Sequence, residues 1–249
     1  MASPKFLLVG DVRTGGTVIC ETLNKHPALK VLTELFDNNP DETVLKIRQD
    51  IFYNLYNFVT PRPHLKNTLD QTLNFIPLIN KVYEGFNGFK LHRESHVSYN
   101  NPTWAYLAAR TDIKIIHLYR KNLLLQIISE KLAQQSGVWH LQNKEKRPEW
   151  RKIYFEPVFL NSIFNQRASL VEYYKYMFAQ SENLVISYEE IEQNIKSVIK
   201  VCLDFLGMPQ ADLEIPFRKL TTAKPKDILY NYSELVEYFK GTRFEEFFV

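Results

Sequence analysis

Short apolar runs without polar alternation recur along the chain, and longer segments with helical spacing of apolar residues separate them. Uninterrupted apolar runs are typical of strands that are buried on both faces, whereas spacings of three and four predict amphipathic helices. This pattern predicts strands at residues 6–9, 31–33, 88–92, 113–119 and 184–188. It predicts helices at 17–25, 42–58, 66–81, 101–110, 122–135, 159–178, 189–206 and 232–240, with an irregular segment at 138–158.

The alternation of strands and helices predicts an α/β fold. We expect residues 1–249 to form one domain, in which helices cover both faces of a parallel sheet. Ligands of such sheets bind at the carboxyl ends of the strands. The polar residues that follow the predicted strands are therefore the first candidates for a functional site.

The composition of the chain argues against some classes of binding partner. A formal net charge of +3 with scattered basic residues argues against a nucleic-acid surface, and the chain has no apolar run long enough for a membrane span. Cys20 and Cys202 lie in apolar helical patterns, so we expect buried free thiols. Free thiols and the lack of a signal peptide favour a cytoplasmic protein. The 17 Phe and 14 Tyr residues fit an enzyme with an apolar pocket.

The loop after the first predicted strand has the spacing of a phosphate-binding loop. Gly10, Gly15 and Thr17 match the pattern G-x-x-x-x-G-K-[ST], but Gly16 stands where the pattern has lysine. A nucleoside triphosphatase needs that lysine on the β- and γ-phosphates. The loop therefore predicts a P-loop-like anion site and argues against ATP or GTP chemistry.

The residues that remain in this loop still form an anion cradle. Gly15 and Gly16 allow close approach of backbone amides, and the N-terminus of the next helix adds partial positive charge. We expect hydroxyl donors from Thr14 and Thr17, and a cation from Arg13.

A second polar group follows the strand predicted at 113–119. Arg120 comes directly after that strand, and the next helix carries Asn122, Gln126 and Ser129 on one face. A polar stripe on an otherwise apolar helix predicts a face that is turned toward a ligand.

These segments together resemble the bacterial, small-molecule type of PAPS-dependent sulfotransferases, where PAPS is 3′-phosphoadenosine 5′-phosphosulfate. Residues 6–10 and 13–17, then His26-Pro27 and Glu34, are similar to the family's segment that binds the 5′-phosphosulfate. The chain departs from the family pattern at three positions, where Val12 replaces Pro, Thr14 replaces Ser and Gly16 replaces Thr.

Two further segments carry the same resemblance. Arg120 and Ser129 match the family's residues for the 3′-phosphate. Tyr188, followed by Glu189 and Glu190, matches a tyrosine that contacts the adenine. Residues 37–85 and 138–180 match nothing in the family, and family members differ there in the acceptors that they bind.

The resemblance implies an enzyme that transfers a sulfuryl group from PAPS to a hydroxyl or amino group of a small molecule, such as a secondary metabolite. The desulfated product is PAP. The family offers two candidates for the base, Glu34 and His92, and the sequence does not choose between them. Arg13 and Lys90 are expected to neutralise charge on the transferring group.

Three alternatives remain at this point. His92, Glu94 and His96 alternate along one possible strand face and form a candidate metal site, although no fourth ligand is evident. A P-loop kinase or nucleotide hydrolase is the second alternative, and it needs the lysine that the loop lacks. A nucleotide-binding module without catalysis is the third, and the presence of Glu34 and His92 argues against it.

Overall fold

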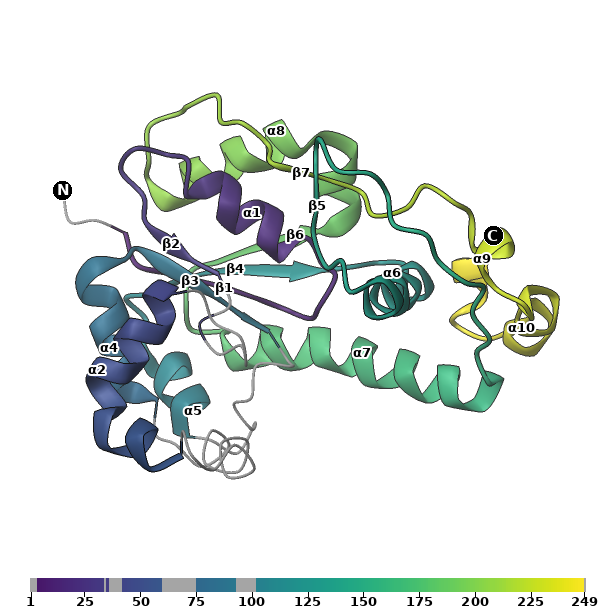
Figure 1. The fold of residues 1–249 in the computed structure, drawn as a ribbon, viewed down its shortest axis with the longest axis horizontal. Coiled ribbons are helices and arrows are strands. Elements are labelled where there is room, and N and C mark those ends of the chain that lie inside the picture. Colours follow the sequence, from purple (N-terminus) through teal and green to yellow (C-terminus); the bar gives the residue numbers. More distant parts are fainter. Residues whose placement is uncertain (1–3, 34, 36–41, 60–74, 93–101, 249) are drawn as a thin grey trace.

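A five-stranded sheet forms the centre of the computed structural model, which describes residues 4–33, 35, 42–59, 75–92 and 102–248 (Figure 1). All neighbouring strands of the sheet run parallel, in the order β2-β3-β1-β4-β6. The strands are β1 (Phe6–Gly10), β2 (Val31–Leu32), β3 (Gly88–His92), β4 (Lys114–Tyr119) and β6 (Asn183–Ser187). The α/β fold with a parallel sheet is therefore confirmed.

Helices connect the strands and cover both faces of the sheet. They are α1 (Gly16–Leu23), α2 (Glu42–Val59), α4 (Ile76–Gly85), α5 (Pro102–Ala109), α6 (Leu123–Ser136), α7 (Pro157–Met177), α8 (Tyr188–Leu206), α9 (Pro225–Ile228), α10 (Tyr232–Phe239) and the 3-10 helix η1 (Glu245–Phe248). In Figure 1, α1 and α8 lie on one side of the sheet, and α4, α5 and α7 lie on the other.

The two faces of the sheet have separate hydrophobic cores. Phe6 and Leu8 of β1 pack with residues of α1 and α8, whereas Leu7 and Val9 pack with residues of α4, α5 and α7. All four side chains are almost completely buried. A strand with no polar position is the form that a central parallel strand requires, because both faces are removed from water.

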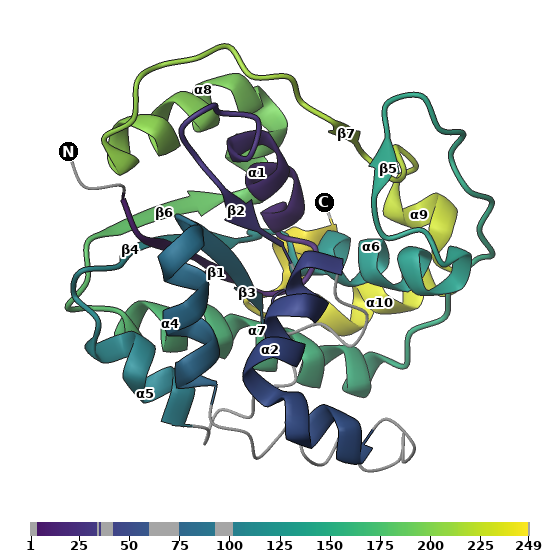
Figure 2. The ribbon, with the colours of Figure 1, turned by 60° about the vertical axis from the view of Figure 1, so that its left-hand side comes forward.

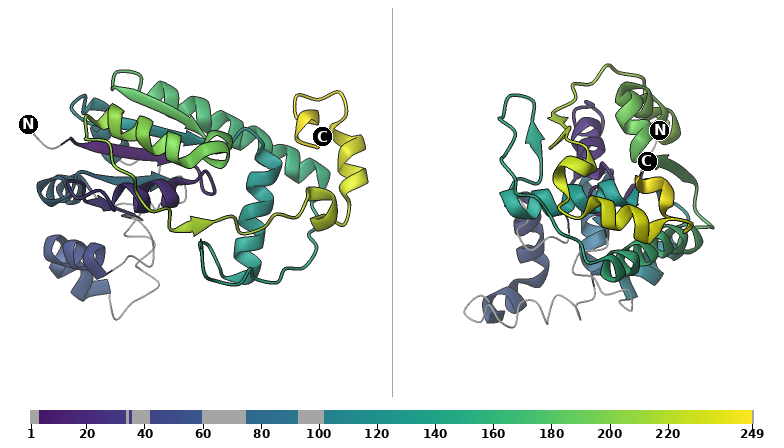
Figure 3. Two further views of the ribbon diagram at one scale, coloured as in Figure 1. Left: turned by 90° about the horizontal axis from the view of Figure 1, so that it is seen from above. Right: turned by 90° about the vertical axis from the view of Figure 1, so that its right-hand side faces the viewer.

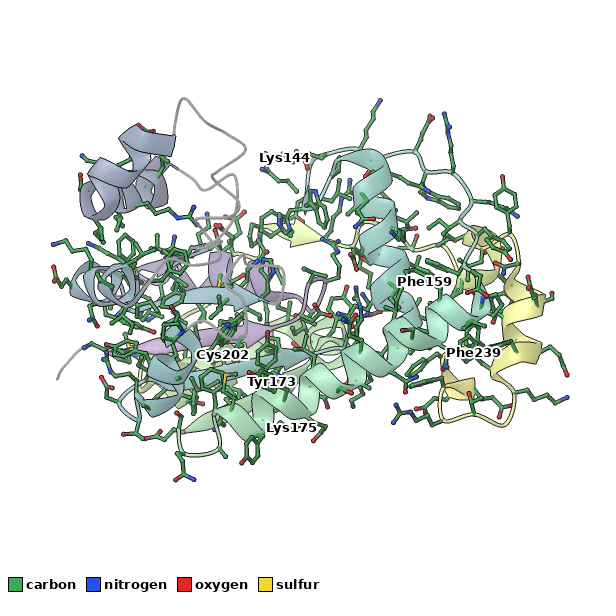
Figure 4. All side chains as sticks on the ribbon, turned by 90° about the horizontal axis from the view of Figure 1, so that it is seen from below. Lys144, Phe159, Tyr173, Lys175, Cys202 and Phe239 are labelled. Carbon is green, nitrogen blue, oxygen red and sulfur yellow. The ribbon has the colours of Figure 1, made fainter. Side chains whose placement is uncertain are left out.

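A third core lies beyond the carboxyl ends of the strands. Side chains of α6 and of the first half of α7 pack there with α9, α10 and η1. The ring of Phe164 lies 5.1–6.4 Å from four phenylalanine rings of the C-terminal region, which are Phe239, Phe244, Phe247 and Phe248. Figure 4 labels Phe239 in this region. Many of the phenylalanines thus build a core that supports α6 rather than a binding pocket.

Most expected elements are confirmed, and the main differences concern two helix boundaries and three short elements. Helix α7 begins at Pro157 instead of residue 159, because Glu156 caps it by accepting from the amides of Val158 and Phe159. Helix α4 extends to Gly85, beyond the expected end at residue 81, and the start expected at 66 lies outside the described residues. The short strands β5 (Leu141–Gln142) and β7 (Phe217–Arg218), and the helix α9, were not predicted. They are too short to leave a periodic pattern.

The cysteine prediction is confirmed. Cys20 and Cys202 are both buried free thiols in the core between the sheet, α1 and α8. Burial raises the pKa of the Cys202 thiol to about 12.

In the part of the chain that the structure describes, no helix has both the length and the apolar character needed to cross a membrane.

The close approach of β1 to β4 gives a first test of the fold. A Cβ at Gly10 would overlap the carbonyl oxygen of Leu118 and lie 3.2 Å from the Thr14 hydroxyl. We expect Gly10→Ala to lower the free energy of unfolding by about 1–3 kcal/mol, because backbone atoms must move apart. Urea unfolding followed by circular dichroism measures the change. Gly85→Ala is the matched control, because a Cβ there meets nothing within 4 Å and alanine is the better helix former. A similar loss in both variants would contradict the explanation.

Candidate anion-binding site

The candidate site begins where β1 ends, at the centre of the sheet. Gly10 is aligned with His92 of β3 on one side and with Leu118 of β4 on the other. From β1 the chain turns toward β2 and β3, whereas β4 and β6 lie on the opposite side. A sheet of this kind opens a crevice at the point where the direction changes, and ligands bind there.

The loop between β1 and α1 has two residues in the left-handed region. Arg13 has φ 62°, and Gly15, the N-cap of α1, has φ 88°. Left-handed residues next to right-handed ones turn successive amides inward, and such turns bind anions. A non-glycine residue in this region is strained, so other contacts must hold the loop.

Asp11 provides these contacts from inside the loop. Its Oδ1 accepts from the amide of Val12 at 2.9 Å, and its Oδ2 accepts from Gln126 Nε2 at 3.1 Å. Gln126 Nε2 also donates to the carbonyl oxygen of Val12 at 2.7 Å. Helix α6 therefore holds both the side chain and the backbone of the loop.

A buried arginine of α7 completes this anchor. Arg167 Nη1 lies 3.5 Å from Asp11 Oδ2, and Arg167 Nη2 forms an ion pair with Glu130 of α6. Arg167 and Glu130 are 6% and 8% exposed, so water screens these charges little. The sequence analysis missed Asp11 and Arg167. Asp11 was visible as the one carboxylate within the loop, but Arg167 gives no signal in a helix with many polar positions.

The polar stripe of α6 differs from the expectation. Asn122 caps the helix by accepting from the amide of Leu125, and Gln126 binds the loop. Only Ser129 contacts a candidate ligand-binding side chain, since its hydroxyl accepts from Arg13 Nε at 3.0 Å. The stripe is thus turned mainly toward the loop, because the loop's own polar groups need partners.

Thr14 also differs. Its hydroxyl donates to the carbonyl oxygen of Asp11 at 2.7 Å, and the residue is 3% exposed. The proton of this hydroxyl is therefore used to close the loop, and a ligand would meet the hydroxyl of Thr17 instead.

Two arginines place positive charge at the site. Arg13 comes from the loop, and Arg120, which directly follows β4, lies with its guanidinium carbon 4.1 Å from the ring centre of Tyr188. Burial lowers the pKa of both guanidinium groups, and the charge of Arg120 lowers that of Arg13 further. Among the described residues, Arg120 Nε is buried and has no hydrogen-bond partner. A buried arginine with an open donor fits an anion that completes its environment.

Lys90 of β3 supplies a third cation and explains Gly16. Lys90 Nζ donates to Thr17 Oγ1 at 3.0 Å, and the side chain is largely buried. A Cβ at Gly16 would lie 2.8 Å from Lys90 Cδ. The absence of a side chain at position 16 therefore makes room for the stem of Lys90, which brings an ammonium group to the loop from the neighbouring strand.

Of the two candidate bases, His92 lies within the described residues and Glu34 does not. His92 lies at the end of β3 beside Gly10 and is partly buried. Glu34 lies outside the described residues, as do Glu94 and His96 of the candidate metal site. In the described ranges, no group of three or more His, Cys, Asp or Glu side chains is arranged to hold a metal ion.

His117 of β4 is not a base candidate, although it lies near the site in sequence. Its ring packs edge-on against Tyr174 of α7 at 5.7 Å, on the far face of the sheet from α1. Burial lowers its pKa to about 4, and the residue is only 2% exposed, so the imidazole has little access to an acceptor from solvent.

The fold places this chain among the sulfotransferases in architecture. The crystal structure of a sulfotransferase from Alicyclobacillus acidocaldarius superimposes with a TM-score of 0.50, over 96% of this chain and 92% of that one. Because the two sequences are 18% identical, this similarity shows a shared fold only. No curated protein matches the chain.

The family model described as "Stf0 sulphotransferase" matches residues 103–234, which is more than half of the chain. The chain therefore belongs to the Stf0 sulphotransferase family, and family and fold together support sulfotransfer as its activity. The matched residues include Arg120, Ser129 and Tyr188, whereas the loop after β1 lies before the matched region.

The packing of Gly16 against Lys90 gives a second test. We expect Gly16→Ala to lower the free energy of unfolding by about 1–3 kcal/mol, because the new methyl group displaces the lysine stem. In a Lys90→Ala background the stem is gone, so the same substitution should cost little. Urea unfolding of the four proteins of this cycle measures the coupling between the two positions. Equal losses in the two backgrounds would mean that Lys90 does not determine the residue at position 16.

Proposed function

We propose that this sulfotransferase uses PAPS as its donor and transfers the sulfuryl group to a hydroxyl or amino group of a small molecule. The observation that carries this proposal is the convergence of Arg13, Lys90 and Arg120 on one loop. A phosphosulfate nucleotide carries several negative charges, which these three cations can balance.

The residues present fit such a donor. The open Nε of Arg120 and the hydroxyl of Ser129 are assigned to the 3′-phosphate, and the ring of Tyr188 to the adenine. The amides of residues 13–17 and the side chains of Arg13 and Thr17 are assigned to the 5′-phosphosulfate, and Arg13 is close enough to Ser129 to link the two phosphate sites. Thr14 contributes its amide, because its hydroxyl donates to Asp11. When bound, PAPS supplies an activated sulfuryl group.

The chain's own groups then have three tasks. Arg13 and Lys90 neutralise charge beside the loop, which favours a transition state in which negative charge moves to the leaving phosphate. Thr17, held by Lys90, orients the anion at the N-terminus of α1. Glu34 or His92 removes the proton of the acceptor, and His92 is the one whose position beside Gly10 supports this role.

The remaining expectations belong to the same proposal. Residues 1–249 act as one sulfotransferase domain in the cytoplasm, with a secondary metabolite as acceptor and without nucleic acid or membrane as partners. The segments that match nothing in the family, 37–85 and 138–180, are the proposed source of acceptor specificity.

The donor is tested by isothermal titration calorimetry with PAP in the presence of EDTA. We expect binding at micromolar affinity, because protein groups alone hold both phosphates. Arg120→Ala should weaken PAP by about 1.5–3 kcal/mol and weaken adenosine 5′-phosphosulfate, which has no 3′-phosphate, much less. Arg151→Ala, which changes an exposed arginine, is the control. A strict metal requirement, or binding of ATP as tight as that of PAP, would exclude this donor and favour a kinase or nucleotide hydrolase.

The base is tested by turnover. If Glu34 or His92 accepts the acceptor's proton, Glu34→Gln or His92→Asn should lower kcat by about 10² or more and leave PAP affinity within a few fold. The reason is that proton removal matters in the transition state, whereas other residues hold the donor. Glu42→Gln, an exposed carboxylate at the start of α2, is the control. Near-normal turnover in both variants would mean that neither residue is the base.

A further inference from the structure

A segment that follows α6 lies against the loop after β1. Helix α6 ends at Ser136 and is capped by Gly137, which has φ 70°. The carbonyl oxygen of Trp139 then accepts from Arg13 Nη1. The next residue but one starts β5, which pairs with β7 as a small antiparallel ribbon (Figure 2). A side-chain contact from Asn143 Nδ2 to the carbonyl oxygen of Ile215, 2.8 Å long, fixes the ribbon at its other end.

This arrangement brings an imidazole to the loop. His140 Nε2 lies 3.4 Å from Thr17 Oγ1, and the His140 ring packs 5.6 Å from the ring of Phe217 in β7. Figure 3 shows the ribbon beside the end of the sheet from two directions. His140 as a whole is an exposed residue.

Thr17 therefore has nitrogen atoms from two distant parts of the chain on one hydroxyl. Lys90 Nζ approaches from β3 and His140 Nε2 from the ribbon, while Arg13 lies in the same loop. An ammonium group only donates, so Lys90 uses one of the two lone pairs of the hydroxyl oxygen. The second lone pair can accept from an Nε2–H of His140, and in the other tautomer Nε2 accepts the hydroxyl proton instead. An Nε2–H that faces the loop in this way can also donate to an anion bound there.

We propose that His140 is an anion-binding residue of the site, which donates to the phosphate or sulfate oxygens held by the loop at 13–17. On the proposed function, on which this assignment rests, these oxygens belong to the 5′-phosphosulfate end of the donor. The direction of Nε2 toward Thr17 supports binding of the loop's anion.

The test compares two ligands by calorimetry. PAP carries both the 5′- and the 3′-phosphate, whereas adenosine 3′-monophosphate carries only the latter. We expect His140→Ala to weaken PAP about tenfold and to leave adenosine 3′-monophosphate unchanged, because one charge-assisted contact to the 5′ end is lost. His140→Lys, which restores a cationic donor, should recover part of the loss. Gln142→Ala changes an exposed residue of the same ribbon and should alter neither ligand.

Each other outcome overturns the assignment. Equal weakening of both ligands would mean that His140 only supports the structure. If His140→Ala leaves the affinity for PAP unchanged but lowers turnover, His140 acts as a base and does not bind the anion. If the wild-type protein binds inorganic phosphate but not PAP, the proposed donor is wrong, and inorganic phosphate replaces PAP in the same comparison to decide the role of His140. Failure of the wild-type protein to bind either would overturn both proposals.

Discussion

The buried carboxylate of Asp11 is the constraint on which the site depends. The cationic side chains around the loop repel one another, and the left-handed backbone of Arg13 adds strain. Asp11 offsets both the repulsion and the strain. Its carboxylate accepts a hydrogen bond from Gln126 of α6, which holds the loop in place, and it lies beside Arg167 of α7. Glu130 shares the charge of Arg167, so the anchor contains two carboxylates and one guanidinium, and the side chains of all three are at most 10% exposed. Removal of one partner from such a group is costly, which keeps α6, α7 and the loop in one arrangement.

Arg13 and Arg120, which do not belong to this anchor, contact neutral groups. Arg13 donates to a serine hydroxyl and a backbone carbonyl, and Arg120 lies over the face of Tyr188. Neither contact supplies a full negative charge, and burial already disfavours both charged groups. Within the described part of the chain, neither Arg13 nor Arg120 forms an ion pair, although nearby glutamates favour the charged forms of both groups. On the proposed function, an anion would therefore bind these two arginines without displacing a paired carboxylate.

Support for the site reaches to the end of the chain. Asn122 Nδ2 donates to the carbonyl oxygen of Phe247, and the phenylalanines of α10 and η1 pack against α6 and α7 from beyond the sheet. The C-terminal core therefore fixes the helix that carries both Gln126 and Ser129. This use of aromatic residues was not expected from composition, since the number of phenylalanines does not say whether they line a pocket or fill a core.

The sequence by itself determined the parallel sheet, most helices and the phosphate-loop spacing, and it singled out Arg13, Arg120 and Ser129 as candidates for the site. Each of these depends on local patterns: apolar runs, helical periodicity, or a polar residue at the end of a strand. Only the tertiary structure decided that Gly16 makes room for Lys90, that Gln126 binds the loop, and that Arg167 and His140 reach it. These contacts join residues that are 73 to 156 positions apart, as from Thr17 to Lys90 and from Asp11 to Arg167. Sequence spacing carries no information about such pairs, because the sheet order and the helix packing bring them together.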